Sequence, residues 1–248
     1  MKIRRVLAAD CDPAEYIAGA NRAFGHWGDE ARFAWAFRGG ELLFLDDVAA
    51  SGINYRTLHD GRQVAIITGS WTLPEARGMG AFTRLVEATH EIAKERNAIT
   101  ISFGRKDNVS CRRVEATGAQ IHPTFYCRSA FAAQSMMSLD PDPSLFPTAF
   151  RYTADEWRAQ FIDRPHAKIE CVGEPGEWAA IMERGADVSS ARVLAISNET
   201  ALPLVSDGPV FWFTTKRPTL PCEITDGFLG TFPPTDISDW QIQNGDRM

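Results

Sequence analysis

Four consecutive residues, Arg77-Gly78-Met79-Gly80, have the types and spacing needed to bind a phosphate group. Arginine carries a permanent cation on a planar guanidinium that suits phosphate oxygens. Glycine at two of the positions removes Cβ atoms where a ligand must approach the backbone. A helix that begins directly after the glycines adds backbone N–H groups and the positive end of its dipole. We therefore expect an anion-binding turn here.

This turn lies between a predicted strand and a predicted helix. Residues 63–70 are rich in β-branched side chains, and apolar residues recur at helical spacing from 80 to 96. The motif is not a Walker A loop, because no Gly-Lys-Ser/Thr follows. It is not the Rossmann fingerprint either, because position 83 is Thr83 rather than glycine.

The stretch from Thr72 to Phe82 resembles the acyl-CoA pyrophosphate loop of the GCN5-related N-acetyltransferase (GNAT) superfamily. That loop has the pattern R/Q-x-x-G-x-G/A, commonly after V-x-P-E; Arg77 and Gly80 fit it, and Phe82 replaces the final small residue. The resemblance implies that acetyl-CoA or another acyl-CoA is the co-substrate. The residues implied to bind it here are Trp71, Thr72, Arg77, Gly78, Met79, Gly80, Ala81 and Phe82.

A second stretch, Asp107 to Gly118, resembles the family segment N-x-x-A/S-x-x-x-x-x-x-G-F, whose Asn usually contacts the pantetheine arm. Either Asp107 or Asn108 takes that position, and the resemblance implies that Asn108 and Ser110 bind the co-substrate. Many family members carry a Tyr in this helix as general acid. That position is Val114 or Glu115 here, so the usual acid is missing or comes from another element.

The predicted elements of residues 1–130 follow the order of the GNAT fold. The prediction is an α/β class, with a GNAT-like mixed twisted sheet and flanking helices. In that family the strand before the loop and the next parallel strand splay apart, and the pantetheine arm lies between them. This gap is expected between Gly69–Leu73 and Ala98–Phe103. The expected strands are 2–9, 41–45, 53–58, 63–70, 98–103 and 124–130, and the expected helices are 14–24, 29–37, 80–96 and 110–117.

Residues 131–150 contain several prolines and predict a linker, and residues 151–248 predict a smaller, strand-rich C-terminal domain. Residues 32–37 followed by paired strands resemble residues 156–161 followed by paired strands. A degenerate, partial second GNAT-like unit is therefore one hypothesis, and an unrelated β-rich cap is the other. No second Arg-x-x-Gly loop exists, so only the first half is expected to bind acyl-CoA.

Amide formation from a thioester needs a neutral amine, a group that accepts its proton, and donors for the developing oxyanion. We expect direct attack, with a backbone N–H near Trp71 or Thr72 as donor. Tyr126 and His26 are the candidate catalytic residues, although a packed Tyr and a structural loop His are the alternatives. Cys111 and Cys127 are rival nucleophiles, but neither lies in a Cys-His signature.

The composition of the 248 residues excludes several classes of protein. A net charge of −6 argues against a nucleic-acid partner. No apolar run approaches the roughly 20 residues that span a bilayer, and no signal peptide is recognisable. The five cysteines are scattered without a C-x-x-C pair, which favours a cytoplasmic protein with free thiols and no metal site.

These observations predict an N-acyltransferase that acts on a primary amine of a small molecule, with an amino sugar or a nucleotide-linked amino sugar as one acceptor. The alternative is a non-catalytic acyl-CoA-binding or interaction module with a degenerate active site. A donor on an acyl carrier protein is a third option, because basic residues lie near the expected gap. The C-terminal half either closes over the active site or pairs protomers in a homodimer. The basic residues are Arg105, Lys106, Arg112 and Arg113.

Overall fold

A computed structural model describes residues 2–130, 137–184, 190–204 and 209–247 of the chain. The described residues form two compact units, and each unit combines separate stretches of sequence. Unit 1 contains residues up to 122 and residues 228–236, whereas unit 2 contains residues between 123 and 227 and residues 237–247. The predicted division into 1–130, 131–150 and 151–248 stays a prediction.

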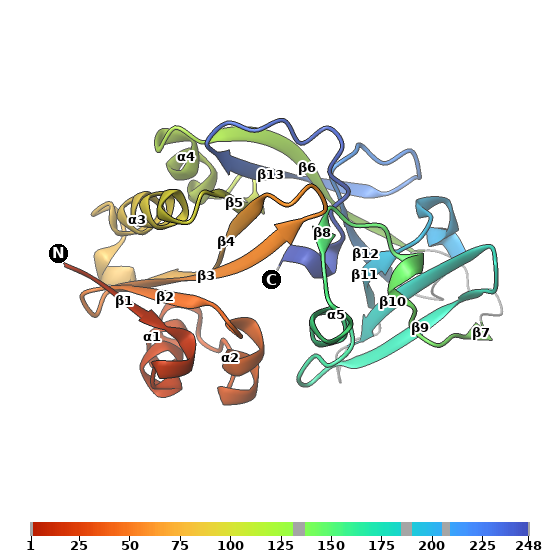
Figure 1. The fold of residues 1–248 in the computed structure, drawn as a ribbon, viewed down its shortest axis with the longest axis horizontal. Coiled ribbons are helices and arrows are strands. Elements are labelled where there is room, and N and C mark those ends of the chain that lie inside the picture. The colour runs from red at the N-terminus through yellow and green to blue at the C-terminus, as the bar shows by residue number, and fades with distance from the viewer. Residues whose placement is uncertain (1, 131–136, 185–189, 205–208, 248) are drawn as a thin grey trace. The chain divides into compact units, whose positions relative to one another are not determined.

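The sheet of unit 1 is mixed, as the resemblance implied (Figure 1). Strands β1 to β4 pair in antiparallel fashion, and β4 pairs with β5 in parallel. A parallel pair needs a crossover connection, and α3 supplies it. The bounds are β1 Ile3–Leu7, β2 Glu41–Leu45, β3 Ala49–Leu58, β4 Gln63–Thr72 and β5 Ala98–Arg105.

Two layers of helices cover this sheet, α1 and α2 on one face and α3 and α4 on the other (Figure 1). Alternate side chains of a strand point to opposite faces. Accordingly Leu42 and Phe44 of β2 pack with α1 and α2, whereas Leu43 and Leu45 pack with α3. The helices are α1 Pro13–Phe24, α2 Glu30–Ala36, α3 Ala81–Glu95 and α4 Val109–Ala116, as expected from the sequence to within a few residues.

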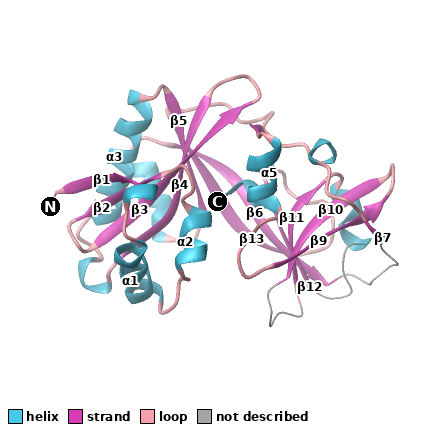
Figure 2. Ribbon diagram, turned by 60° about the horizontal axis from the view of Figure 1, so that its bottom comes forward, coloured by secondary structure: helices cyan, strands magenta, loops and turns pink. Residues whose placement is uncertain are grey.

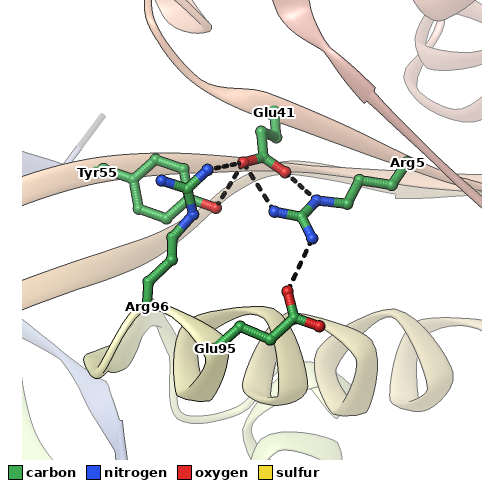
Figure 3. Close-up of polar contacts among 5 residues, drawn as sticks. All are labelled: Arg5, Glu41, Tyr55, Glu95 and Arg96. Atoms are coloured by element: carbon green, nitrogen blue, oxygen red, sulfur yellow. Dashed lines mark hydrogen bonds and ion pairs between the residues drawn. The ribbon is translucent and has the colours of Figure 1, made fainter.

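A buried carboxylate ties the C-terminal end of α3 to the sheet (Figure 3). Glu41 of β2 is 2% exposed and accepts hydrogen bonds from Arg5, from Arg96 at 2.5 Å and from the Tyr55 hydroxyl at 3.1 Å. Arg5 also donates to Glu95 of α3 at 3.0 Å. Burial opposes ionisation of Glu41, but the Arg5 hydrogen bond and charge outweigh it and lower the pKa of the carboxyl.

Unit 2 repeats the strand arrangement of unit 1. Strands β9, β10 and β11 pair in antiparallel fashion, and β11 pairs with β12 in parallel. Helix α5 packs on β9–β11 through Trp157 and Phe161 (Figure 2). This order supports a second GNAT-like unit over an unrelated cap. The elements are β7 Met137–Ser138, β8 Phe150–Arg151, α5 Ala154–Phe161, β9 Lys168–Glu174, β10 Trp178–Arg184, β11 Ala191–Ile196 and β12 Pro209–Thr214.

Two long strands, β6 (Gln120–Ala130) and β13 (Glu223–Phe232), contribute residues to both units. In the strand order β13 lies next to β5, and β6 lies next to β12. Phe125 to Ala130 of β6 pair with β12 in antiparallel fashion. The sequence predicts a strand over 124–130 in the first half and no strand over 223–232, so neither of these pairings was predicted.

Candidate functional site

Strands β4 and β5 separate before either of them ends. Their parallel pairing runs from Gln63–Ala98 to Ile67–Ser102, whereas β4 continues to Thr72 and β5 to Arg105. We call the space between these later residues the β4–β5 gap. The gap was expected to extend along Ala98–Phe103. It is shorter than that, because Ala98–Ser102 pair with β4 and only the end of β5 diverges from β4.

A β-bulge bends β4 where it leaves β5. Ala50 of β3 pairs with Trp71 and Gly52 pairs with Thr68, so that two residues of β4 lie opposite one residue of β3. The first of these, Gly69, has a φ of 57°, a left-handed conformation that glycine adopts without strain. A glycine inside a strand pattern is a sequence signal for such a bulge, and Gly69 is such a glycine.

The predicted anion-binding turn connects β4 to α3. Gly78 and Gly80 have φ values of 83° and 77°, and a Cβ added at either position would meet no atom within 4 Å. The backbone therefore requires these glycines, and the space beside them is open to a ligand. Met79 between them is 61% exposed.

The N-terminus of α3 follows this turn directly. Gly80 occupies the N-cap position and has no side chain that could cap this end of the helix. Ala81 is buried, and Phe82 packs beside Val86 and Phe228 between the helix and the sheet. An uncapped helix N-terminus next to open space fits an anionic group, so the residues present are compatible with a pyrophosphate.

Arg77 is exposed and attaches the turn to α1. Its guanidinium donates to the Ala23 carbonyl at 3.3 Å, and the neighbouring Glu75 pairs with Arg22 of α1 at 2.7 Å. An exposed guanidinium with one long hydrogen bond retains donors for a phosphate oxygen.

The second predicted contact region lies at the start of α4, after β5 ends. Asn108 is the N-cap residue, and its side-chain oxygen accepts from the Ser110 backbone N–H at 3.1 Å. This cap gives the Asn108 side chain a structural role at the start of α4, and its amide NH₂ group can still donate to another partner. Asp107 instead pairs with Arg105 at 2.7 Å. In α4, Val114 is buried and Glu115 is exposed.

The two candidate catalytic residues belong to different units. His26 is exposed in the connection between α1 and α2 of unit 1. Tyr126 lies on β6 within unit 2, where its hydroxyl accepts a hydrogen bond from Arg247 at 2.6 Å and its ring packs edge-on against Phe213. These contacts give Tyr126 a structural role of its own, and its catalytic role stays a proposal.

The cysteine environments oppose an acyl-enzyme route. Cys111 and Cys127 are both buried, and burial raises the pKa of each thiol, to about 12 for Cys127. A buried thiol with a raised pKa holds little of the nucleophilic thiolate at neutral pH. These environments favour direct attack on the thioester.

Within the described ranges, no helix is long and apolar enough to cross a bilayer. The same residues contain no group of His, Cys, Asp or Glu side chains arranged to hold a metal ion.

Comparison with protein families gives one match. Residues 5–114 match the model of the acetyltransferase (GNAT) family. This range covers β1 to most of α4 and includes the bulge, the turn and the uncapped helix N-terminus. No curated protein matches the sequence.

Solved structures resemble the chain over nearly its whole length. A GCN5-related N-acetyltransferase from Anabaena variabilis has a TM-score of 0.61 at 12% identity, covering 92% of this chain and 72% of its own. One from Sphaerobacter thermophilus has a TM-score of 0.56 at 14% identity, covering 95% and 97%. A tandem GNAT protein from the clavulanic acid biosynthesis pathway has a TM-score of 0.58 at 12% identity, covering 95% and 100%. The likeness to a tandem protein agrees with the repeated strand order.

Proposed function

We propose that this protein is an N-acyltransferase that uses acyl-CoA to acylate a primary amine of a small molecule, because residues 5–114 match the model of the acetyltransferase (GNAT) family. The family supports acyl transfer in general and an acceptor that is a small molecule or a peptide. We propose in addition that the donor is acyl-CoA, that the acceptor is a small-molecule amine, and that the amine attacks the thioester without an acyl-enzyme intermediate. An amino sugar or a nucleotide-linked amino sugar is the acceptor class we would test first.

One arrangement carries this proposal: the β4–β5 gap leads directly to the glycine turn and the uncapped N-terminus of α3. The turn residues Arg77-Gly78-Met79-Gly80, with Ala81 and Phe82, would hold the pyrophosphate. Trp71 and Thr72 at the end of β4 would pair with the pantetheine arm from one side of the gap. Asn108 and Ser110 would contact the arm from the start of α4.

Acyl-CoA supplies the thioester carbonyl carbon that the amine attacks. Backbone N–H groups of Trp71 or Thr72 would donate to the oxygen that becomes negative during attack. His26 is the proposed group that accepts a proton from the amine, and Tyr126 is the proposed proton donor to the leaving thiolate. Neither Val114 nor Glu115 of α4 offers the hydroxyl that many family members use.

The missing tyrosine in α4 favours one competing function, a non-catalytic acyl-CoA-binding module. Such a protein would bind the co-substrate without releasing the thiol. Release of free CoA measured with a panel of amines, including amino sugars, separates the two functions. His26→Ala and Tyr126→Phe should each lower the release rate without lowering CoA affinity if the proposed proton transfers occur.

The first test is thermal stability with acetyl-CoA, longer acyl-CoAs and free CoA. A ligand that binds only the folded state stabilises it by about 2.7 kcal/mol at a hundredfold excess over its dissociation constant. We expect a raised Tm with all three and a dependence on acyl length that identifies the preferred donor. An unchanged Tm with every CoA ligand would overturn the proposal that acyl-CoA is the donor.

A further inference from the structure

A single tyrosine of α1 holds the bulge of β4. The Tyr16 hydroxyl donates a hydrogen bond to the backbone carbonyl of Gly69, and the Tyr16 side chain is fully buried. Burial raises the pKa of Tyr16 well above its usual range, so the hydroxyl keeps its proton and acts as the donor. The two residues are 53 positions apart in the sequence, so no local pattern predicts this contact.

The rings around Tyr16 leave it little freedom to move. Its ring centroid lies 4.7 Å from that of Phe37 and 5.1 Å from that of Trp27, and Phe33 and Trp71 also contact it. The bulge fits closely against the same rings, because a Cβ added to Gly69 would lie 2.6 Å from the Tyr16 hydroxyl oxygen and 2.7 Å from Phe37. A closely packed aromatic cluster therefore fixes both ends of this hydrogen bond.

The hydrogen bond determines the direction of the strand after the bulge. A trans peptide is planar, so fixing the Gly69 carbonyl also fixes the N–H of Ser70 on the opposite side of the same peptide. The next residues, Trp71 and Thr72, lie on the part of β4 that has already left β5. The Leu73 N–H donates to the Val48 carbonyl on the β3 side at 2.9 Å. Since successive N–H groups of a strand point to opposite edges, the Thr72 N–H faces the β4–β5 gap, and its position depends on how the bulge turns the chain.

We propose that Tyr16 is a positioning residue for acyl transfer, whose hydrogen bond to Gly69 holds the backbone N–H of Thr72 in place for the thioester carbonyl oxygen. This inference rests on the proposed function, because it assumes that an acyl-CoA lies in the β4–β5 gap. Donors that stabilise an oxyanion must be held within about 0.5 Å of the productive geometry, which a strand end without an anchor does not provide.

The test is infrared difference spectroscopy of bound acetyl-CoA that carries ¹³C at the thioester carbonyl. Hydrogen bonds to this oxygen lower its stretching frequency, so the wild-type complex should absorb at a lower frequency than free acetyl-CoA. Tyr16→Phe removes only the hydroxyl, and we expect it to lose about half or more of that frequency shift. Its affinity for free CoA, which has no acyl carbonyl, should stay within about twofold of wild type.

Tyr55→Phe is the matched control, because it removes a hydroxyl that donates to Glu41 at 3.1 Å rather than to the bulge. It should keep the wild-type carbonyl frequency. A wild-type frequency in folded Tyr16→Phe with acetyl-CoA bound would overturn the role of Tyr16 and leave the proposed function standing. Failure of the wild-type protein to bind acetyl-CoA would overturn both.

Gly69→Ala tests the same contact from the other side and replaces Tyr16→Phe if that variant does not fold. Its new methyl group would press against the Tyr16 hydroxyl and break the hydrogen bond. We expect the same loss of frequency shift, and a wild-type frequency in this variant would also overturn the proposal.

Discussion

The two units have the same strand arrangement but differ at the point where their parallel strands separate. In unit 1, β4 and β5 diverge after Ile67–Ser102, and the glycine turn and α3 follow. In the described part of unit 2, β11 and β12 pair at Ala191–Val210 and Arg192–Phe211, although β11 continues to Ile196 and β12 to Thr214. Both strand pairs diverge, but the two units differ in which chemical groups form hydrogen bonds with the backbone of the diverging strands.

In unit 2 the protein's own C-terminal segment, residues 241–247, occupies this position. The Gln243 side chain donates to the Ile196 carbonyl at 3.1 Å and accepts from the Ile196 N–H at 3.2 Å. The Asn244 side chain donates to the Val193 carbonyl at 3.1 Å. The 3₁₀ helix Asn244–Arg247 contacts both β11 and β12. Side-chain amides thus satisfy the strand groups that a pantetheine arm would meet in unit 1.

The connection between the parallel strands differs as well. Unit 1 uses the glycine turn and the 15-residue helix α3, whereas the described part of the unit 2 connection contains the 3₁₀ helix Glu199–Leu204. The repeated fold therefore does not repeat the site. A splayed strand pair binds a ligand only when its backbone groups are left for that ligand and a phosphate-binding turn follows.

The largest effect is expected from breaking the C-terminal segment of unit 2. Asp246 is fully buried and accepts hydrogen bonds from the Tyr152 hydroxyl at 2.8 Å, the Thr148 hydroxyl at 2.7 Å and the Gln243 backbone N–H at 2.7 Å. Asp246→Ala leaves these buried donors without the carboxylate and should lower the free energy of unfolding by about 4 kcal/mol. Urea denaturation measures this change.

The exposed Asp239 provides the control for that variant, since Asp239→Ala should change stability by no more than about 0.5 kcal/mol. Equal stability of the two variants would mean that the C-terminal segment contributes little to unit 2.

The next largest effect is expected from a glycine substitution that should weaken CoA binding in unit 1 but not when it is made in unit 2. Gly80→Glu places a carboxylate at the N-terminus of α3, where the pyrophosphate is proposed to bind. CoA affinity measured by calorimetry should fall roughly a hundredfold, about 2.7 kcal/mol. Gly176→Glu is the matched control in unit 2, because Gly176 has a similar φ of 82° and open space beside it. Unchanged CoA binding in folded Gly80→Glu would place the site elsewhere.

The smallest effect concerns the anchor of α3, the helix whose counterpart is not found in the described part of unit 2. Glu41→Gln removes the charge that Arg5 and Arg96 surround and should lower the free energy of unfolding by about 1–2 kcal/mol. CoA affinity should stay at the wild-type value, because the glycine turn lies at the other end of the helix. A loss of CoA affinity would show that the anchor and the turn are coupled.

The same carboxyl predicts a pH dependence. Because its pKa is lowered in the folded protein from 4.5, Glu41 stabilises the fold above about pH 4.5, and this contribution is lost as the pH falls through the lowered value. Glu41→Gln lacks this contribution, so its stability should fall less steeply below pH 4.5 than that of wild type. Parallel acid-denaturation curves for the two proteins would contradict this explanation.

Short-range patterns predicted most elements of unit 1. Periods of two and of about 3.6 residues distinguish strands from helices within a dozen residues, and Asp12, Asp29 and Asn108 cap the helices that they precede. The parallel pairing of β4 and β5 followed from the resemblance. Strand β13 was missed because Asp226-Gly227 and Gly230 interrupt its strand pattern with residues that are typical of turns.

Local sequence is sufficient for the glycine turn, since positive φ values at Gly78 and Gly80 and the start of α3 depend on adjacent residues. Which strand groups remain open to a ligand depends instead on tertiary contacts. The Tyr16–Gly69 hydrogen bond joins residues 53 positions apart, and the Gln243–Ile196 hydrogen bonds join residues 47 positions apart. Such contacts form only when distant elements pack together, so no local pattern encodes them.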